Sequence, residues 1–405
     1  MNTRAVGALV VAEVVSVLGS RMTYLALPWF VLVTTGSAGK MSFVLAAQML
    51  PMALLGIPSG TVVERFGGRT TMLVSDFART PLMAAIPLLH AAGLLSFPLL
   101  LAFVFLLGVF MPPYFASQRV VLPELVGEDE RLMSQANSAI EGGTGLASLA
   151  GPALAGLLIP FLGAPNVLYV DAATFLASFL IVLVLVPRRR PLGVPAQHGV
   201  LAGLRFVFHD GLLGPLTVTL VGFGLLGSAL SAGLPVFAYE AFHGSSRVAG
   251  LFYASLAAGA VVGSIVAVVV VRRVAPLRLA GLAILAFAVP LWLLPFHPPA
   301  GLVVAALFVA MCFTPLVNGP VIGVLTARTP EQLRAKAMTA VISVNTIAAP
   351  LGFLGAGQVI ERWGVDVVFA IVPAGISALA LAFASIALRH RAEDRALAPS
   401  PAATA

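Results

Sequence analysis

The sequence predicts an all-α membrane protein with about twelve transmembrane helices in two pseudo-symmetric six-helix bundles. Its 405 residues are 60% hydrophobic and only 10% charged, and the mean hydropathy is +1.03. A soluble domain carries about 25% charged residues. Apolar runs of about 20 residues recur along the chain, and each is long enough to cross a hydrocarbon core about 30 Å thick. Similar short segments also recur in the same order in both halves of the chain.

Helices are expected for these runs because backbone polar groups in lipid must be satisfied within the protein, and barrel strands would be shorter and alternating. The first run follows a single basic residue, Arg4, and is too long for a signal peptide, so we expect an uncleaved first span. The expected spans are 5–33, 42–63, 71–90, 97–118, 135–160, 165–187, 214–239, 248–271, 277–296, 299–325, 337–360 and 365–388.

The longest polar connection lies at the middle of the chain and reads PRRRPLGVPAQHG. It separates an N-terminal bundle (1–187) from a C-terminal bundle (211–388), with a cytoplasmic linker (188–210) between them. The end of the linker, VLAGLRFVFHD, is either a short helix on the membrane surface or an ordinary connection. The polar, Ala- and Pro-rich tail (389–405) is expected to be disordered.

The net charge of +7 is explained by membrane topology, so we expect no nucleic-acid partner. With both termini in the cytoplasm, only Lys40, Arg247 and Arg362 fall in outer segments, and Arg21 and Arg79 lie within spans. All other basic residues then lie on the cytoplasmic side, which is the distribution that the positive-inside rule requires.

The two bundles resemble each other in sequence, which predicts a duplicated fold. LPWF at 27–30 matches LPVF at 234–237, and VLPELVGEDER at 121–131 matches VLTARTPEQLR at 324–334. Transporters built from such repeats bind substrate between the halves, near the middle of the membrane.

The loop after the second span, GTVVERFGGRTTM, resembles the signature loop of the major facilitator superfamily. Glu64 stands where that family usually has Asp, and Gly68 where a basic residue is common. In the family this loop acts as a gate at the cytoplasmic ends of the helices. The residues assigned to the gate loop are Gly60, Glu64, Arg65, Gly67, Arg69 and, on the following span, Arg79.

The resemblance covers most of the chain through SVLGSRMTYLALPW, SDFAR, VLPELV, ANS, GPALAG and DAATFLAS. Together they are similar to the drug-exporting branch that includes macrolide efflux proteins and siderophore exporters. GPALAG resembles the antiporter motif of exporters at Gly151, Pro152 and Gly156, although Ala155 replaces a Gly. It predicts a bent fifth span that moves against span 11. The alternative is generic packing of small residues.

Two charged residues lie within the first span, Glu13 and Arg21, eight residues apart on one helical face. Charge within a membrane is costly and is usually functional, so we expect the pair to face a central cavity. Glu13 is a candidate proton-binding or cation-recognising carboxylate that Arg21 tunes; the alternative is a static polar contact. Asp76 is a further proton-coupling candidate, expected mainly as a partner of Arg65 or Arg69. Asp171, near the outer end of span 6, is interpreted as a helix-end contact rather than a proton relay.

An amphipathic ligand suits a cavity with aromatic walls and few polar anchors. The candidate cavity residues are Tyr24, Gln48, Phe110, Tyr114, Phe223, Tyr239, Phe313 and Asn318. The sole cysteine, Cys312, excludes an intrachain disulfide, and no motif indicates a metal, a cofactor, ATP binding or catalysis.

These patterns favour a monomeric exporter of amphipathic drugs in a bacterial inner membrane. Transport would be driven by proton antiport with alternating access. One alternative is export or flipping of a particular lipid, lysolipid or siderophore. Another is a membrane sensor or scaffold that does not transport, and a membrane enzyme is the least favoured.

Overall fold

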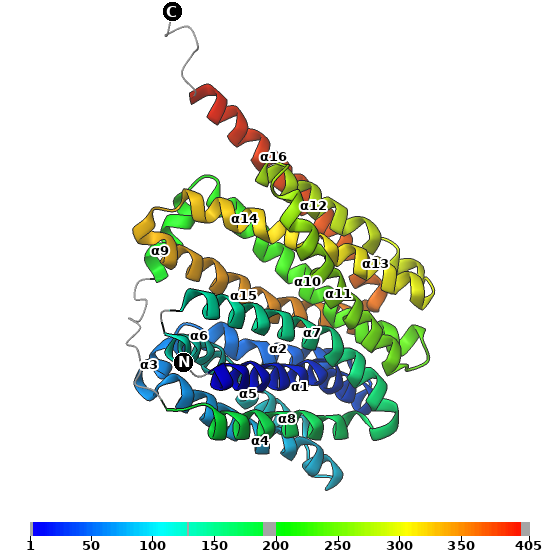
Figure 1. Cartoon of the computed structure of the whole chain (residues 1–405). Coiled ribbons are helices and arrows are strands. Elements are labelled where there is room, and N and C mark those ends of the chain that lie inside the picture. Colours follow the sequence, from blue (N-terminus) through cyan, green and yellow to red (C-terminus); the bar gives the residue numbers. More distant parts are fainter. Residues whose placement is uncertain (1–2, 128, 189–199, 398–405) are drawn as a thin grey trace, which may run out of the picture.

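The computed structural model describes residues 3–127, 129–188 and 200–397 (Figure 1). The described residues form helices and no strand. Twelve of their helical segments are long and apolar enough to cross a membrane, in agreement with the prediction from sequence.

The helices follow the expected order, with two bundles on either side of a short connecting helix. In the N-terminal half they are α1 (Thr3–Thr35), α2 (Ala38–Leu55), α3 (Ser59–Phe66), α4 (Gly68–Ala91), α5 (Phe97–Val109), α6 (Met111–Val126), α7 (Glu130–Leu162) and α8 (Ala164–Leu185). The rest are α9 (Val200–His209), α10 (Leu213–Ala241), α11 (Ser246–Val270), α12 (Pro276–Leu291), η1 (Leu294–Phe296), α13 (Ala300–Cys312), α14 (Thr314–Arg328), α15 (Glu331–Trp363) and α16 (Val365–Leu397).

Two expected spans are broken at equivalent places in the two halves. Span 4 divides into α5 and α6 at Phe110, and span 10 divides into α13 and α14 at Phe313. Each break is followed by proline in the first turn of the next helix. Proline lacks a backbone N–H, so it is accepted at the start of a helix but interrupts the middle of one.

The structure defines three of the expected segments more closely. The end of span 2 is a separate short helix, α3, beyond α2. Within the linker, Val200–His209 form the helix α9, and the expected place of this segment on the membrane surface stays a prediction; residues 189–199 lie outside the described residues. The expected disordered tail begins too early, because α16 continues to Leu397; residues 398–405 again lie outside the described residues.

The duplication extends to the way helices end. Helices α7 and α15 both contain 33 residues, and they end at Gly163 (φ 81°) and Gly364 (φ 85°). A positive φ is readily adopted by glycine and strained for other residues, so glycine allows the sharp turn into the next helix.

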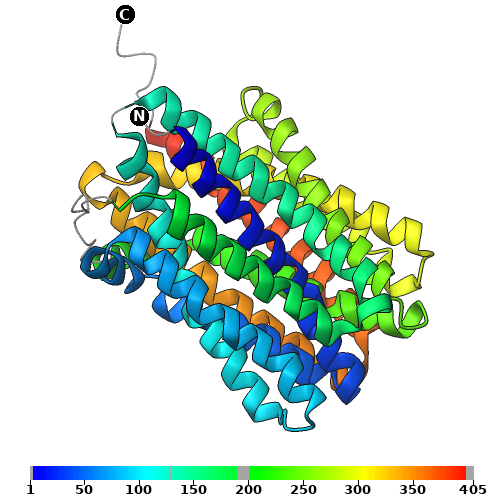
Figure 2. The same cartoon turned by 60° about the horizontal axis from the view of Figure 1, so that its bottom comes forward.

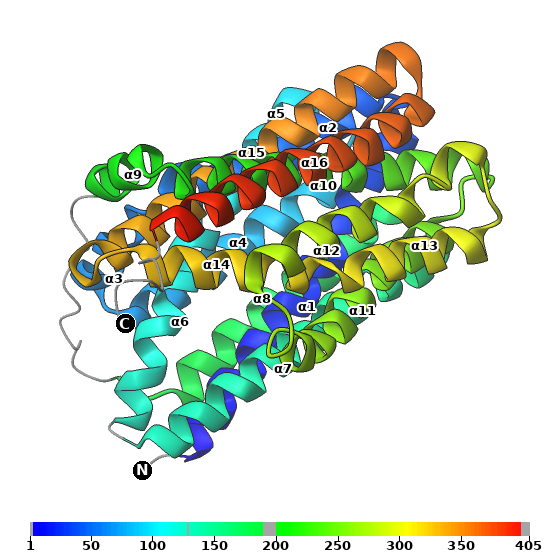
Figure 3. The same cartoon turned by 90° about the horizontal axis from the view of Figure 1, so that it is seen from above.

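The halves meet mainly through two helix pairs, α7 with α11 and α2 with α15, and α1 adds smaller contacts with α10 and α11. Figure 2 shows α1 between α7 and α8, and Figure 3 shows α15 beside α10 and α2. We call the end of the molecule that carries Thr3, α3 and α9 the N-terminal end. There the halves have separate apolar clusters, around Leu9 and Val207, whereas one large cluster joins both halves elsewhere. The halves are therefore packed together mainly at the opposite end.

Candidate functional site

The first contact between the halves is made by small residues of α7 and α11. The Ser246 Oγ donates a hydrogen bond to the Gly156 carbonyl oxygen at 3.2 Å. A Cβ on Gly156 would lie 2.6 Å from the Ser246 carbonyl oxygen, and a Cβ on Gly250 would lie 2.7 Å from the Pro152 carbonyl oxygen. Glycine is thus needed on both helices for this approach.

The second contact joins α2 to α15. The Ser37 Oγ donates to Glu361 Oε1 at 2.9 Å, and a Cβ on Gly357 would lie 2.5 Å from the Ser42 Oγ. The expectation that span 5 moves against span 11 was therefore wrong. The two duplicated halves face each other, so span 5 (α7) contacts span 8 (α11), and span 11 (α15) contacts span 2.

The antiporter-like motif has a second neighbour, α1. A Cβ on Gly151 would lie 2.5 Å from the Cβ of Arg21 and 3.1 Å from the Leu18 carbonyl oxygen. Gly151 and Pro152 are buried, like Gly156. The motif thus lies where α7 is packed between its own half and the other half.

The gate loop lies at the N-terminal end and packs within its own half. Glu64 and Arg65 are exposed, and α3 packs on α4 and α6. Gly67, with φ 82°, turns the chain from α3 into α4, while Gly60 lies within α3. The Arg69 guanidinium donates to the carbonyl oxygens of Val186 (2.6 Å) and Leu183 (2.8 Å) at the C-terminal end of α8. A cation is favourable there because the last carbonyls of a helix carry partial negative charge.

The expectation that Asp76 pairs with Arg65 or Arg69 was wrong, and Arg79 does not lie in the gate loop. Asp76 and Arg79 are both buried and pair with each other on α4 at 2.5 Å. The Ser178 Oγ donates to Asp76 Oδ2 at 2.7 Å. They pair with each other because three residues is nearly one helical turn.

The Arg79 guanidinium is held between two aromatic rings. Its Cζ lies 4.5 Å from the centre of the Tyr114 ring and 4.3 Å from the centre of the Phe175 ring. Tyr114 is 1% exposed, so it belongs to this cluster and does not line an open cavity as expected. Nothing in the sequence pairs a residue of α6 with one of α4, so only the fold reveals this site.

Asp171 is also fully buried, in the third turn of α8. The Thr23 Oγ1 of α1 donates to Asp171 Oδ2 at 2.5 Å, and the Thr174 Oγ1 lies 3.2 Å from Oδ1. Its interpretation as a helix-end contact was wrong, because Asp171 lies in the third turn of α8 and joins that helix to α1. We call Asp76, Arg79, Tyr114, Asp171 and Ser178 the buried polar cluster.

Glu13 and Arg21 lie in different environments on α1. Glu13 is 4% exposed, and its Oε2 has no hydrogen-bond partner among the described residues. Arg21 is exposed beside Gly151, and the ion pairs between described residues do not include one between these two. Eleven residues after Glu13, on the same face of α1, Tyr24 packs edge-to-face on Tyr253 of α11 at 5.6 Å. Glu13 thus lies on the same face of α1 as Tyr24, which contacts the C-terminal half, whereas Val6 and Leu9 on this face pack within the N-terminal half.

The remaining cavity candidates are spread over the molecule. Tyr239 packs on Trp29 across the two halves at 6.0 Å, whereas Phe223 is buried against Phe287 within the C-terminal half. Asn318 is exposed, and Phe313 and Gln48 are half-buried. The structure therefore does not place these candidates around a single cavity.

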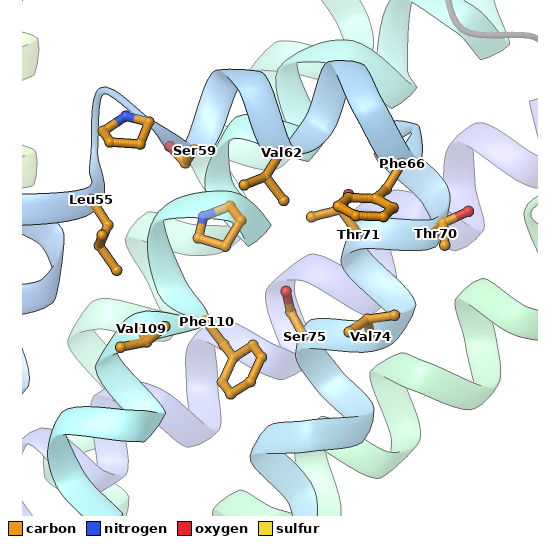
Figure 4. A pocket seen from close by; sticks show the side chains of 12 residues that line it. Leu55, Ser59, Val62, Phe66, Thr70, Thr71, Val74, Ser75, Val109 and Phe110 are labelled. Carbon is orange, nitrogen blue, oxygen red and sulfur yellow. The ribbon is translucent and has the colours of Figure 1, made fainter. Parts of the chain in front are cut away.

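Phe110 lines an apolar pocket of about 340 Å³ between α2, α3, α4, α5 and α6 (Figure 4). Figure 4 shows Phe110 and Val109 on one side of it and Val62, Phe66 and Val74 on the other. This pocket lies wholly within the N-terminal half. No pattern in the sequence pointed to it, because its walls come from five helices.

Comparisons with known proteins agree with this architecture. The model of the Major Facilitator Superfamily matches residues 9–276 and 216–404. The multidrug efflux pump Tap of Mycolicibacterium fortuitum is 27% identical over 365 residues, which cover 87% of this chain and 88% of that protein. An uncharacterized transporter of the same type from Sinorhizobium fredii, y4rN, is 27% identical over 94% of both chains.

Solved structures support the fold at lower sequence identity. The nucleoside transporter NupG superimposes with a TM-score of 0.75 at 16% identity, covering 95% of this chain and 99% of that one. A bacterial homolog of the human lysosomal transporter Spinster, in an inward-facing and unoccupied conformation, gives a TM-score of 0.70 at 14% identity, covering 96% and 95%. With twelve helices among the described residues that are long and apolar enough to span a membrane, and a family model that matches nearly its whole length, the chain belongs to the Major Facilitator Superfamily of membrane transporters.

Proposed function

We propose that this transporter exports amphipathic drugs from a bacterial cell in exchange for protons. The names of its relatives from Mycolicibacterium and Mycobacterium, which are multidrug efflux pumps, support export of drugs. The excess of basic residues at the N-terminal end supports a cytoplasmic location for both termini. In that orientation the contacts between the halves close the outer side, so the protein is ready to receive substrate from the cytoplasm.

The observation that carries the coupling mechanism is the buried carboxyl group of Glu13 with its unpartnered Oε2. An ionised carboxylate in such a position is very costly unless it is paired, whereas a proton or a cationic substrate removes the cost. Glu13 shares a helical face with Tyr24, which contacts the C-terminal half, so we infer that movement of the halves changes what can reach Glu13. Competition between a proton and a cationic substrate at Glu13 is the requirement for antiport.

The experiment is flux of a cationic dye in proteoliposomes with an imposed pH gradient. We expect Glu13→Gln to abolish uphill, gradient-driven export while downhill exchange of the dye continues. Glu130→Gln is the matched control, because it removes an exposed carboxylate from the first turn of α7. Normal uphill transport by Glu13→Gln would refute the role of Glu13.

Export of a lipid or lysolipid is the second candidate function. The apolar pocket of about 340 Å³ favours it, because its walls are nearly all hydrocarbon and an acyl chain would need no polar partner there. The same proteoliposomes separate the two functions: a lipid exporter moves a labelled lysolipid and leaves the cationic dye in place.

A further inference from the structure

The buried polar cluster contains one more carboxylate than it has cations. Arg79 is 3% exposed, and Asp76 and Asp171 are both 0% exposed. The guanidinium of Arg79 is paired with Asp76 at 2.5 Å, and Ser178 supports the same carboxylate. Among the described residues, no ion pair involves Asp171. A buried charge without a partner is among the most costly arrangements in a protein.

The hydrogen bonds around Asp171 do not compensate for a charge there. Thr23 supplies one short bond, to Oδ2. The Thr174 hydroxyl lies 2.7 Å from the Asp171 backbone oxygen and 3.2 Å from Oδ1. A hydroxyl carries one hydrogen, so the Thr174 hydroxyl divides it between these two acceptors and gives a charge at Oδ1 little support. With a proton on Asp171, Oδ1–H can instead donate to the Thr174 oxygen, and the conflict is removed.

The charged and titratable groups on the neighbouring helices leave this conclusion unchanged. Helix α4 contributes the Asp76 and Arg79 pair, and α6 contributes Tyr114. Helix α1 presents Thr23 and Gly19 to Asp171, while its Glu13 and Arg21 occupy other environments. The charged residues of α7, which are Glu130, Arg131 and Glu141, are all exposed.

We propose that Asp171 is a second proton-binding site, occupied while α1 and α8 are packed together and emptied when they separate. Gly19 makes this packing tight, since a Cβ there would collide with the side chains of Asp171 and Thr174. Only separation of the two helices gives water access to the carboxyl group, so loss of the proton is linked to a movement within the N-terminal half. This role in transport rests on the proposed proton antiport, but the bound proton itself is measurable without transport.

The test is infrared spectroscopy of the purified full-length protein in lipid nanodiscs at neutral pH, with no substrate. A protonated carboxyl group gives a C=O stretching band that an ionised carboxylate lacks. We expect Asp171→Asn to lose one such component and Glu130→Gln to lose none. An unchanged protonated-carboxyl band in Asp171→Asn would overturn the proposal.

Two further variants separate this inference from the proposed function and from misfolding. Glu13→Gln should leave the Asp171 component in place, whatever it does to dye export. Thr23→Val removes the donor to Oδ2 and should shift the Asp171 component to higher frequency, which tests the site even if Asp171→Asn does not fold. A spectrum of Thr23→Val identical to that of the unmodified protein would count against a proton on Asp171.

Discussion

Substitution of Gly156 by Ala is expected to open the contact between α7 and α11. The added Cβ would lie 2.6 Å from the Ser246 carbonyl oxygen and 3.0 Å from the Gly250 Cα. Both are backbone atoms, so no side-chain rotation relieves the overlap. The two helices must separate by about 0.8 Å to restore an ordinary contact of 3.4 Å.

The size of the effect follows from the cost of overpacking, which is about 1–3 kcal/mol for an added methyl group without free space. This cost falls on the conformation in which the halves touch and is relieved when they part. The equilibrium therefore moves toward the separated conformation by about 5- to 150-fold.

Disulfide crosslinking at the other contact between the halves measures this shift. Cysteines replace Ser37 and Glu361, whose Oγ and Oε1 atoms are 2.9 Å apart, in a Cys312→Ala background. We expect Gly156→Ala to slow crosslinking at least fivefold. Gly145→Ala on the same helix is the matched control, because its Cβ meets no atom within 4 Å and the gain in helix propensity is the same. Equal crosslinking rates in the two variants would refute the argument.

Three further predictions concern the N-terminal half and the topology. Arg69→Ala removes charged hydrogen bonds to the C-terminal end of α8. It should slow dye flux severalfold and leave the ligand affinity, measured by equilibrium binding, nearly unchanged. Equal losses of flux and of affinity would exclude a gating role. Arg79→Met leaves Asp76 buried without its partner and should lower the free energy of unfolding by about 3–5 kcal/mol. Thermal unfolding in detergent measures this loss, and the Asp76→Asn/Arg79→Met double variant should recover the stability. Single cysteines replacing Arg131 and Arg247 should react with an impermeant thiol reagent only from the cytoplasmic and the outer side, respectively; the reverse pattern would overturn the proposed orientation.

Much of the fold was predictable because lipid constrains sequence strongly. A membrane span needs about 20 apolar residues, so each crossing is visible as a run, and the duplication is visible because both halves keep segments such as LPWF and LPVF. The breaks at Phe110 and Phe313 were missed, because the apolar run continues through them and only the following prolines mark the new helix.

The partners of the charged residues were less predictable. Spacing along one helix places Asp76 and Arg79 close together, but the nearby gate loop offered other cations, and the sequence does not say that Tyr114 and Phe175 enclose the guanidinium. Glu13 and Arg21 share a helical face by spacing, yet contact different surroundings, because α7 packs against Arg21.

The sequence alone determined that this protein spans the membrane about twelve times, that it is duplicated and that it carries a few costly charges within its spans. Those properties depend on local composition, because each polar or charged group placed in the hydrocarbon of the membrane has its own energetic cost. Only the tertiary structure decided that α7 contacts α11 rather than α15, and that Asp171 joins α8 to α1. Such contacts join residues 90 and 148 positions apart, and they depend on how whole helices pack, which no short segment specifies.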